Sequence, residues 1–130
     1  MAPRTVKADA HAKAGRMQVA QQFFAAAEIV RELADDDEDL TNAYVTLCVH
    51  AGIAAADVLC AAGRGEYARG DSHHEAVALV RTVDPEAAKD LSALLSLKTM
   101  AGYGTTTIRS DRVRRATRAM DSLMDIARRV

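Results

Sequence analysis

The sequence predicts an all-α protein made of five helices. Alanine, the residue with the highest helix propensity, fills 27 of the 130 positions. Apolar residues also recur at three- and four-residue spacing, which is the period of an amphipathic helix. A chain of this length supports one core. We therefore expect residues 1–130 to form a single domain, with residues 1–6 as a flexible N-terminus.

The first helix is expected over about 7–34, and the second over about 40–62. One face of the first helix carries Met17, Ala20, Phe24, Ala27, Val30 and Ala34. The acidic run at 35–39 interrupts this pattern, and either Asp37 or Asp39 is expected to cap the second helix.

The second helix is apolar over a wide arc, which predicts a central position in the bundle. Gly52 lowers helix propensity, and a close helix crossing would explain it. His50 and Asp57 lie seven positions apart on one side of this helix. They are either satisfied at a helix interface or form the wall of a polar groove.

The stretch "RGDSHHEA", residues 69–76, is expected to begin the third helix. Ser72 and Glu75 have the spacing of a capping box, and apolar residues follow directly. His73 and His74 fall in the first turn, about 100° apart around the helix axis. This arrangement does not match the usual spacing of metal ligands, so we predict no bound metal.

The fourth helix is expected to begin at "VDPEAAKD", with Asp84 as its cap and Pro85 at its first position, and to continue to about 101. Lys98 lies on or beside the apolar stripe that includes Leu91 and Leu94. Its side chain either extends to solvent near the helix C-terminus or points into a groove.

"GYGTTTIRSD" predicts a turn before a last helix that begins at Ser110 and Asp111. A regular apolar seam follows at Val113, Ala116, Met120, Leu123, Ala127 and Val130. Residues 109–130 contain seven arginines and three aspartates. The cluster formed by Arg112, Arg114, Arg115 and Arg118 is either a solvated face or a phosphate-binding surface.

Composition also predicts the compartment. The first residues are polar, and we expect no stretch of transmembrane length, which predicts a cytoplasmic protein without membrane contact. Cys48 and Cys60 are twelve positions apart on one expected helix, about 18 Å at helical rise, which is too far for a disulfide between them.

Two stretches resemble HEPN domains, the higher eukaryotes and prokaryotes nucleotide-binding helical bundles. "TLCVHAGIAAADVLCAAGRGEYARGDSHHEAVALV" resembles their second helix, loop and third helix, and "LLSLKTMAGYGTTTIRSDRVRRATRAMDSLMDIARRV" resembles their closing two helices. The likeness covers most of residues 40–130. It implies an antiparallel up-and-down bundle of four main helices plus one short helix, and usually a dimer.

Many members of that family are ribonucleases of toxin or defence systems. They use an arginine followed four to six residues later by a histidine, near the end of the penultimate helix. Here Lys98 and Tyr103 best match these positions. Lysine keeps the charge without the planar fork that grips phosphate. Tyrosine, with a pKa near 10, cannot replace histidine as a base at neutral pH.

Arg69 and His74 have the arginine-to-histidine spacing, but they lie in the loop before the third helix. We interpret this spacing as coincidence, with an auxiliary phosphate contact as the alternative. The small side chains leave each chain a modest core, which favours oligomerisation.

The sequence therefore predicts a HEPN-like helical homodimer that binds RNA or nucleotide without RNase activity and without a cofactor. The binding groove is predicted to include Lys98, Tyr103, Arg69, His73 and His74. One alternative is a metal-independent endoribonuclease toxin of a toxin–antitoxin or defence system, in which Tyr103 and a loop histidine complete the site. The other is a non-enzymatic protein-interaction module whose protein partner is encoded nearby.

Overall fold

The computed structural model describes residues 4–34, 40–70 and 72–130. The protein is mostly helical, as predicted. Its long helices are α1 (Ala10–Leu33), α2 (Thr41–Arg64), α3 (His73–Val83), α4 (Pro85–Leu95) and α6 (Ser110–Arg128). A short helix, α5 (Lys98–Tyr103), precedes α6, and two strands, β1 (Thr5–Lys7) and β2 (Glu66–Ala68), pair with each other.

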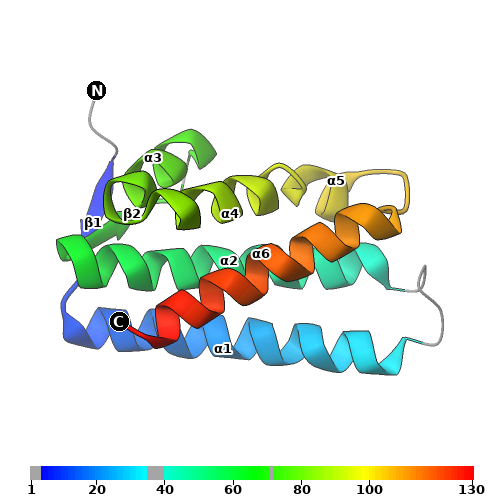
Figure 1. The fold of residues 1–130 in the computed structure, drawn as a ribbon, viewed down its shortest axis with the longest axis horizontal. Helices are drawn as coiled ribbons and strands as arrows, with labels where there is room; N and C mark the ends of the chain where they lie inside the picture. Colours follow the sequence, from blue (N-terminus) through cyan, green and yellow to red (C-terminus); the bar gives the residue numbers. More distant parts are fainter. Residues whose placement is uncertain (1–3, 35–39, 71) are drawn as a thin grey trace.

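Helix α2 lies at the centre of the bundle (Figure 1). Helix α1 runs along one side of it, α3 and α4 cover the opposite side, and α6 crosses in front. Along the chain, α1, α2, α4 and α6 alternate in direction. The central position predicted for the second helix is confirmed, because most of the residues in α2 are buried. Tyr44 of α2 and Thr117 of α6 share a hydrogen bond of 2.7 Å between their hydroxyl groups.

Gly52 lies where α2 meets α4 and α6. A methyl group at this position would overlap Leu94 Cδ1 and would lie 3.3 Å from Leu123 Cδ1. Both leucines are fully buried. The close crossing predicted from this glycine is therefore confirmed, and the absent side chain is what lets the leucines pack against the α2 backbone.

The two short strands were not predicted, and they are a small addition to a mostly helical protein. Strands β1 and β2 are antiparallel, with Thr5 opposite Ala68 and Lys7 opposite Glu66. Residues 1–3 lie outside the described residues, but Thr5 and Val6, expected to be flexible, belong to β1. Helix α1 begins at Ala10 because the Asp9 carboxylate accepts a hydrogen bond of 2.8 Å from the Ala12 N–H.

The predicted caps of the third and fourth helices are confirmed. Ser72 Oγ accepts a 3.2 Å hydrogen bond from the Glu75 N–H. The Asp84 carboxylate accepts hydrogen bonds from the N–H groups of Glu86 and Ala87. The Glu75 carboxylate pairs with Arg4 at 3.4 Å, which ties the start of α3 to the residue before β1.

The second helix begins differently from the expectation. Asp37 and Asp39 lie outside the described residues, and Leu40 occupies the capping position with a φ of 63°. Leu40 is a poor cap because its side chain cannot accept a hydrogen bond from the first turn.

The fourth helix does not continue to residue 101 as expected. It ends at Leu95, and α5 begins at Lys98. Ser96 Oγ donates a 2.6 Å hydrogen bond to the Ala93 carbonyl oxygen. A serine hydroxyl that bonds to the preceding turn competes with helical hydrogen bonding, which favours a break at this point. The break makes Lys98 the first residue of a new helix.

Helix α2 has the length and apolar composition of a membrane span, contrary to our expectation that no stretch would reach it. Within the protein, however, 67% of its most apolar window is buried. A core helix needs the same composition as a membrane span, so the composition of α2 is explained by its central position in the bundle.

Candidate functional site: a polar cluster around Lys98

A small cavity lies between α2, the turn before α3, α3 itself and the end of α4. Its volume is about 40 Å³, room for little more than a group the size of a water molecule. The cavity wall includes the apolar side chains Cys60, Val80, Leu91 and Leu95. The polar residues that line it are Asp57, Ser72, His73 and Lys98.

Lys98 is the cation of this site. It is half-buried, and it forms no hydrogen bond or ion pair with any residue that the structure describes. Burial lowers the pKa of His50 and of His73, and the nearby Lys98 charge lowers both further. Both imidazoles are therefore neutral at neutral pH, and His73, although exposed, lines the same cavity as Lys98. We call Lys98, His50 and His73 the Lys98 cluster.

His50 projects from the middle of α2 and is held by an aromatic contact. Its ring stacks on Phe23 of α1, with the ring centroids 5.1 Å apart and the planes inclined by 26°. Phe23 is itself half-buried. This stacking fixes the orientation of one of the two imidazoles beside Lys98.

Asp57 lies two helical turns after His50 on α2 and lines the same cavity. Its carboxylate accepts a 2.9 Å hydrogen bond from Arg16 Nε of α1. Burial raises the pKa of Asp57 to about 6, although Arg16 acts in the opposite direction. Both alternatives considered for Asp57 therefore apply. It is paired with Arg16 at a helix interface, and it also forms part of the polar wall of the cavity.

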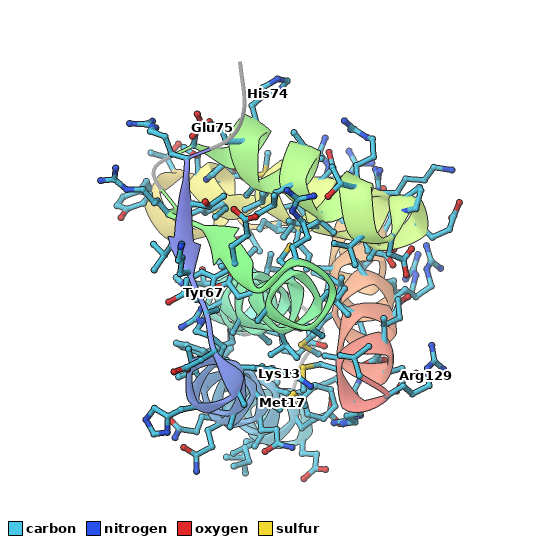
Figure 2. All side chains as sticks on the ribbon, turned by 90° about the vertical axis from the view of Figure 1, so that its left-hand side faces the viewer. Lys13, Met17, Tyr67, His74, Glu75 and Arg129 are labelled. Carbon is cyan, nitrogen blue, oxygen red and sulfur yellow. The ribbon has the colours of Figure 1, made fainter. Side chains whose placement is uncertain are left out.

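Two of the predicted site residues, Lys98 and His73, line the cavity, and three do not. Tyr103 is 84% exposed. It follows Lys98 by five positions on α5, which places it about 140° away around the helix axis. Arg69 is exposed, and its N–H donates to the Arg4 carbonyl oxygen. His74 is also exposed, and in Figure 2 its side chain points away from the bundle.

The cluster has the chemistry of an anion-binding site. An ammonium group supplies charge, and each neutral imidazole offers one N–H donor. The described residues contain no group of three or more histidines, cysteines, aspartates or glutamates placed to hold a metal ion. Cys48 and Cys60 are buried free thiols, and burial raises the pKa of each to about 12, so neither is a ready nucleophile.

The chain matches no protein-family model, and no curated protein matches it significantly. The resemblance to HEPN domains therefore stays a prediction, and the functional argument depends on the geometry of the Lys98 cluster.

Arg16 is the residue of this site that the sequence did not indicate. It lies 41 positions before Asp57, and no local pattern links the two. Only the pairing of α1 with α2 brings the guanidinium to the carboxylate. His50 and Lys98 lie on α2 and α5, which pack against each other, and no local pattern in the sequence links the two residues.

Proposed function

We propose that this protein is a helical module that binds RNA or a nucleotide by a phosphate group at the Lys98 cluster, and that it does not cleave RNA. The observation that carries the proposal is a half-buried lysine without a counter-ion among the described residues, placed beside two neutral imidazoles. A cation in such a position is stabilised by an anion, and phosphate oxygens accept hydrogen bonds from both ammonium and imidazole N–H groups.

The size of the cavity restricts how the ligand binds. A volume of about 40 Å³ has room for one phosphate oxygen and excludes a whole phosphate group, a base or a sugar. The nucleoside part of the ligand therefore lies outside the cavity. The Asp57 carboxylate would repel a phosphate, but Arg16 offsets its charge at 2.9 Å.

The absence of RNase activity is proposed from the residues that replace the family motif. Lys98 and Tyr103 stand where the resemblance expects arginine and histidine. Tyr103 is 84% exposed and does not line the cavity, so it is poorly placed to exchange protons with a phosphate bound there.

A second candidate function is a metal-independent endoribonuclease, and it draws on one observation. His73 is neutral at neutral pH and close to Lys98, so it has the protonation state of a general base. In this reading His73 takes the proton of the ribose 2′-hydroxyl as its oxygen attacks the adjacent phosphorus, and Lys98 stabilises the charge on the phosphate. The bond from phosphorus to the 5′-oxygen breaks, the leaving oxygen takes a proton from water, and a 2′,3′-cyclic phosphate remains.

We also propose that the protein forms a homodimer through α1. Ala20 and Ala27 are the residues buried in this helix, whereas Ile29 and Leu33 are 56% and 72% exposed. A second copy covering this face would remove both side chains from water. A monomer in sedimentation at micromolar concentration would contradict this part of the proposal. A protein partner in place of a second copy would favour the interaction-module alternative.

The binding proposal is tested by fluorescence anisotropy with a labelled single-stranded RNA. Lys98→Ala should weaken binding by about tenfold, the cost of losing one charged hydrogen bond of roughly 1.5 kcal/mol. Lys13→Ala removes the same charge from α1 outside the cluster and should leave the affinity unchanged. Equal affinities for the two variants would contradict the proposal.

Incubation of the wild-type protein with mixed RNA without metal should leave the RNA intact. Cleavage that His73→Ala abolishes would establish the second candidate instead.

A further inference from the structure

A groove separate from the Lys98 cavity runs between α3, α4 and α6. It is lined by Arg81, Pro85, Ala88, Lys89, Ser92, Ala93, Ser96 and Arg115, and we call it the basic groove. Its volume is about 530 Å³, within the range of about 300–1,000 Å³ in which proteins hold small ligands. It is therefore large enough for groups that the Lys98 cavity excludes.

The side chains that line the basic groove are cationic or uncharged. Its lining holds three cationic side chains and no acidic side chain. Arg81 and Arg115 form no ion pair with any residue in the described part of the chain. Lys89 pairs with Glu86 at 3.3 Å, but both side chains are more than 70% exposed, so solvent screens this pair. Arginine is suited to phosphate because its planar fork donates two parallel hydrogen bonds.

The polar residues of α4 form one continuous stripe along this groove. Lys89, Ser92 and Ser96 recur at spacings of three and four, which places them on the same face of the helix. From Lys89 to Ser96 the stripe extends about 10 Å, longer than one phosphate group. Leu91 and Leu95, which line the Lys98 cavity, lie on a different face of α4. A ligand can therefore contact the Lys98 cavity or the basic groove without contacting the other.

Helix α6 extends the positive surface beyond the groove. Arg112 and Arg118 lie one turn to either side of Arg115, and both are exposed. Arg112 contacts the Met100 sulfur at 3.6 Å, which holds it beside α5. Arg112 and Arg115 thus connect the basic groove to α5, the short helix that carries Lys98.

We infer that the basic groove holds the sugar–phosphate backbone of a single-stranded RNA. A positively charged groove that follows the backbone is how proteins bind single strands without reading their sequence. The groove lining contains no aromatic side chain on which a base would stack, so we expect it to contact phosphates, which carry no sequence information. The inference rests on the proposed function, and it identifies the ligand as an oligonucleotide instead of a mononucleotide.

The test compares two ligands and two charge-matched variants. The ligands are labelled AMP and a labelled single-stranded RNA of about 12 nucleotides, within the site sizes of single-strand binders. The groove variant is Arg81→Ala/Arg115→Ala. The control variant is Arg114→Ala/Arg129→Ala, which removes the same charge from residues that do not line the groove; Figure 2 shows Arg129 at the outer surface. All four arginines are exposed, so both variants should fold, which circular dichroism checks.

The groove variant should bind RNA about tenfold more weakly than the control variant, and both should bind AMP equally. The slope of log affinity against log salt should fall by about 1.4 in the groove variant, since each lost single-strand contact removes about 0.7. Equal RNA binding by the two double variants would overturn the groove and leave the Lys98 site standing. RNA binding that needs the groove but not Lys98 would overturn the proposed site and leave the groove standing. Failure of the wild-type protein to bind RNA would overturn the groove inference.

Discussion

At the scale of single residues, the Asp57–Arg16 pair makes the free energy of unfolding depend on pH, and this dependence can be measured. The unfolded carboxyl group titrates near 3.8, whereas burial raises the pKa of folded Asp57 to about 6. Between these values the folded protein holds a proton that the unfolded chain has released. The contribution of Asp57 to stability is therefore fully present below about pH 4 and is lost as the pH rises to about 6.

We predict that Asp57→Asn removes this dependence. The free energy of unfolding of the wild-type protein, measured in urea at several pH values, should decrease relative to that of Asp57→Asn between about pH 4 and pH 6. Above about pH 6 the difference between the two proteins should be constant. A difference that grows in favour of the wild type as the pH rises would contradict the prediction, because it would mean that Arg16 lowers the pKa of Asp57 below its usual value.

Gly52 gives a second prediction at this scale. In Gly52→Ala the new methyl group would overlap fully buried Leu94, and overpacking of this kind costs about 1–3 kcal/mol. Helix propensity returns up to about 1 kcal/mol. We therefore expect a net loss of about 1 kcal/mol in chemical unfolding at fixed protein concentration.

Gly15→Ala is the matched control for this change. Gly15 also lies inside a helix, but nothing approaches its Cβ position within 4 Å. This variant should gain about 0.5–1 kcal/mol from helix propensity alone. If Gly52→Ala gains stability as Gly15→Ala should, the helix crossing at Gly52 is not as tight as described.

At the scale of elements, the start of α3 depends on its cap. Ser72→Ala removes the hydrogen bond from the Glu75 N–H to Ser72 Oγ and should lower stability by about 1 kcal/mol. Ser92→Ala is the comparison, since this exposed serine lies within α4 and donates no hydrogen bond to any described residue. It should change stability by less than about 0.5 kcal/mol. An unchanged unfolding midpoint for Ser72→Ala would remove Ser72 as the cap.

An element could be predicted from the sequence when its pattern of residues was long or chemically specific. The seam of α6 repeats over several turns, and Ala116, Met120, Leu123 and Ala127 are all buried as predicted. The caps at Ser72 and Asp84 are recognisable locally, because each side chain accepts a hydrogen bond from an N–H group two or three residues later. Strands β1 and β2 are three residues each, too short for alternation to be read. The break at Ser96 depends on one hydroxyl group, and serines with the same hydrogen bond also occur inside regular helices.

At the scale of the whole molecule, the two proposed phosphate sites share α4 as their common wall. The Lys98 cavity lies on its inner side, and the basic groove lies along its polar stripe. The sequence predicted Lys98 and His73 as site residues, and both line the cavity. The sequence also placed Tyr103, Arg69 and His74 in this groove, but none of the three lines the cavity. Spacing along a chain does not show which way a loop turns. Contacts such as Arg16 with Asp57 depend on packing between helices and have no local signal.

The central claim, that a phosphate binds at the Lys98 cluster, is tested most directly by NMR of the histidine Cε1–H resonances at about pH 6. Bound phosphate stabilises the charged imidazole, so single-stranded RNA should move the resonances of His50 and His73 toward the imidazolium position. His11 lies on α1 outside the cluster, and its resonance should stay in place. In Lys98→Ala the two cluster resonances should move the same way without ligand, because the Lys98 charge that lowers their pKa is gone. RNA that moves His11 or His74 while leaving His50 and His73 unchanged would contradict the claim.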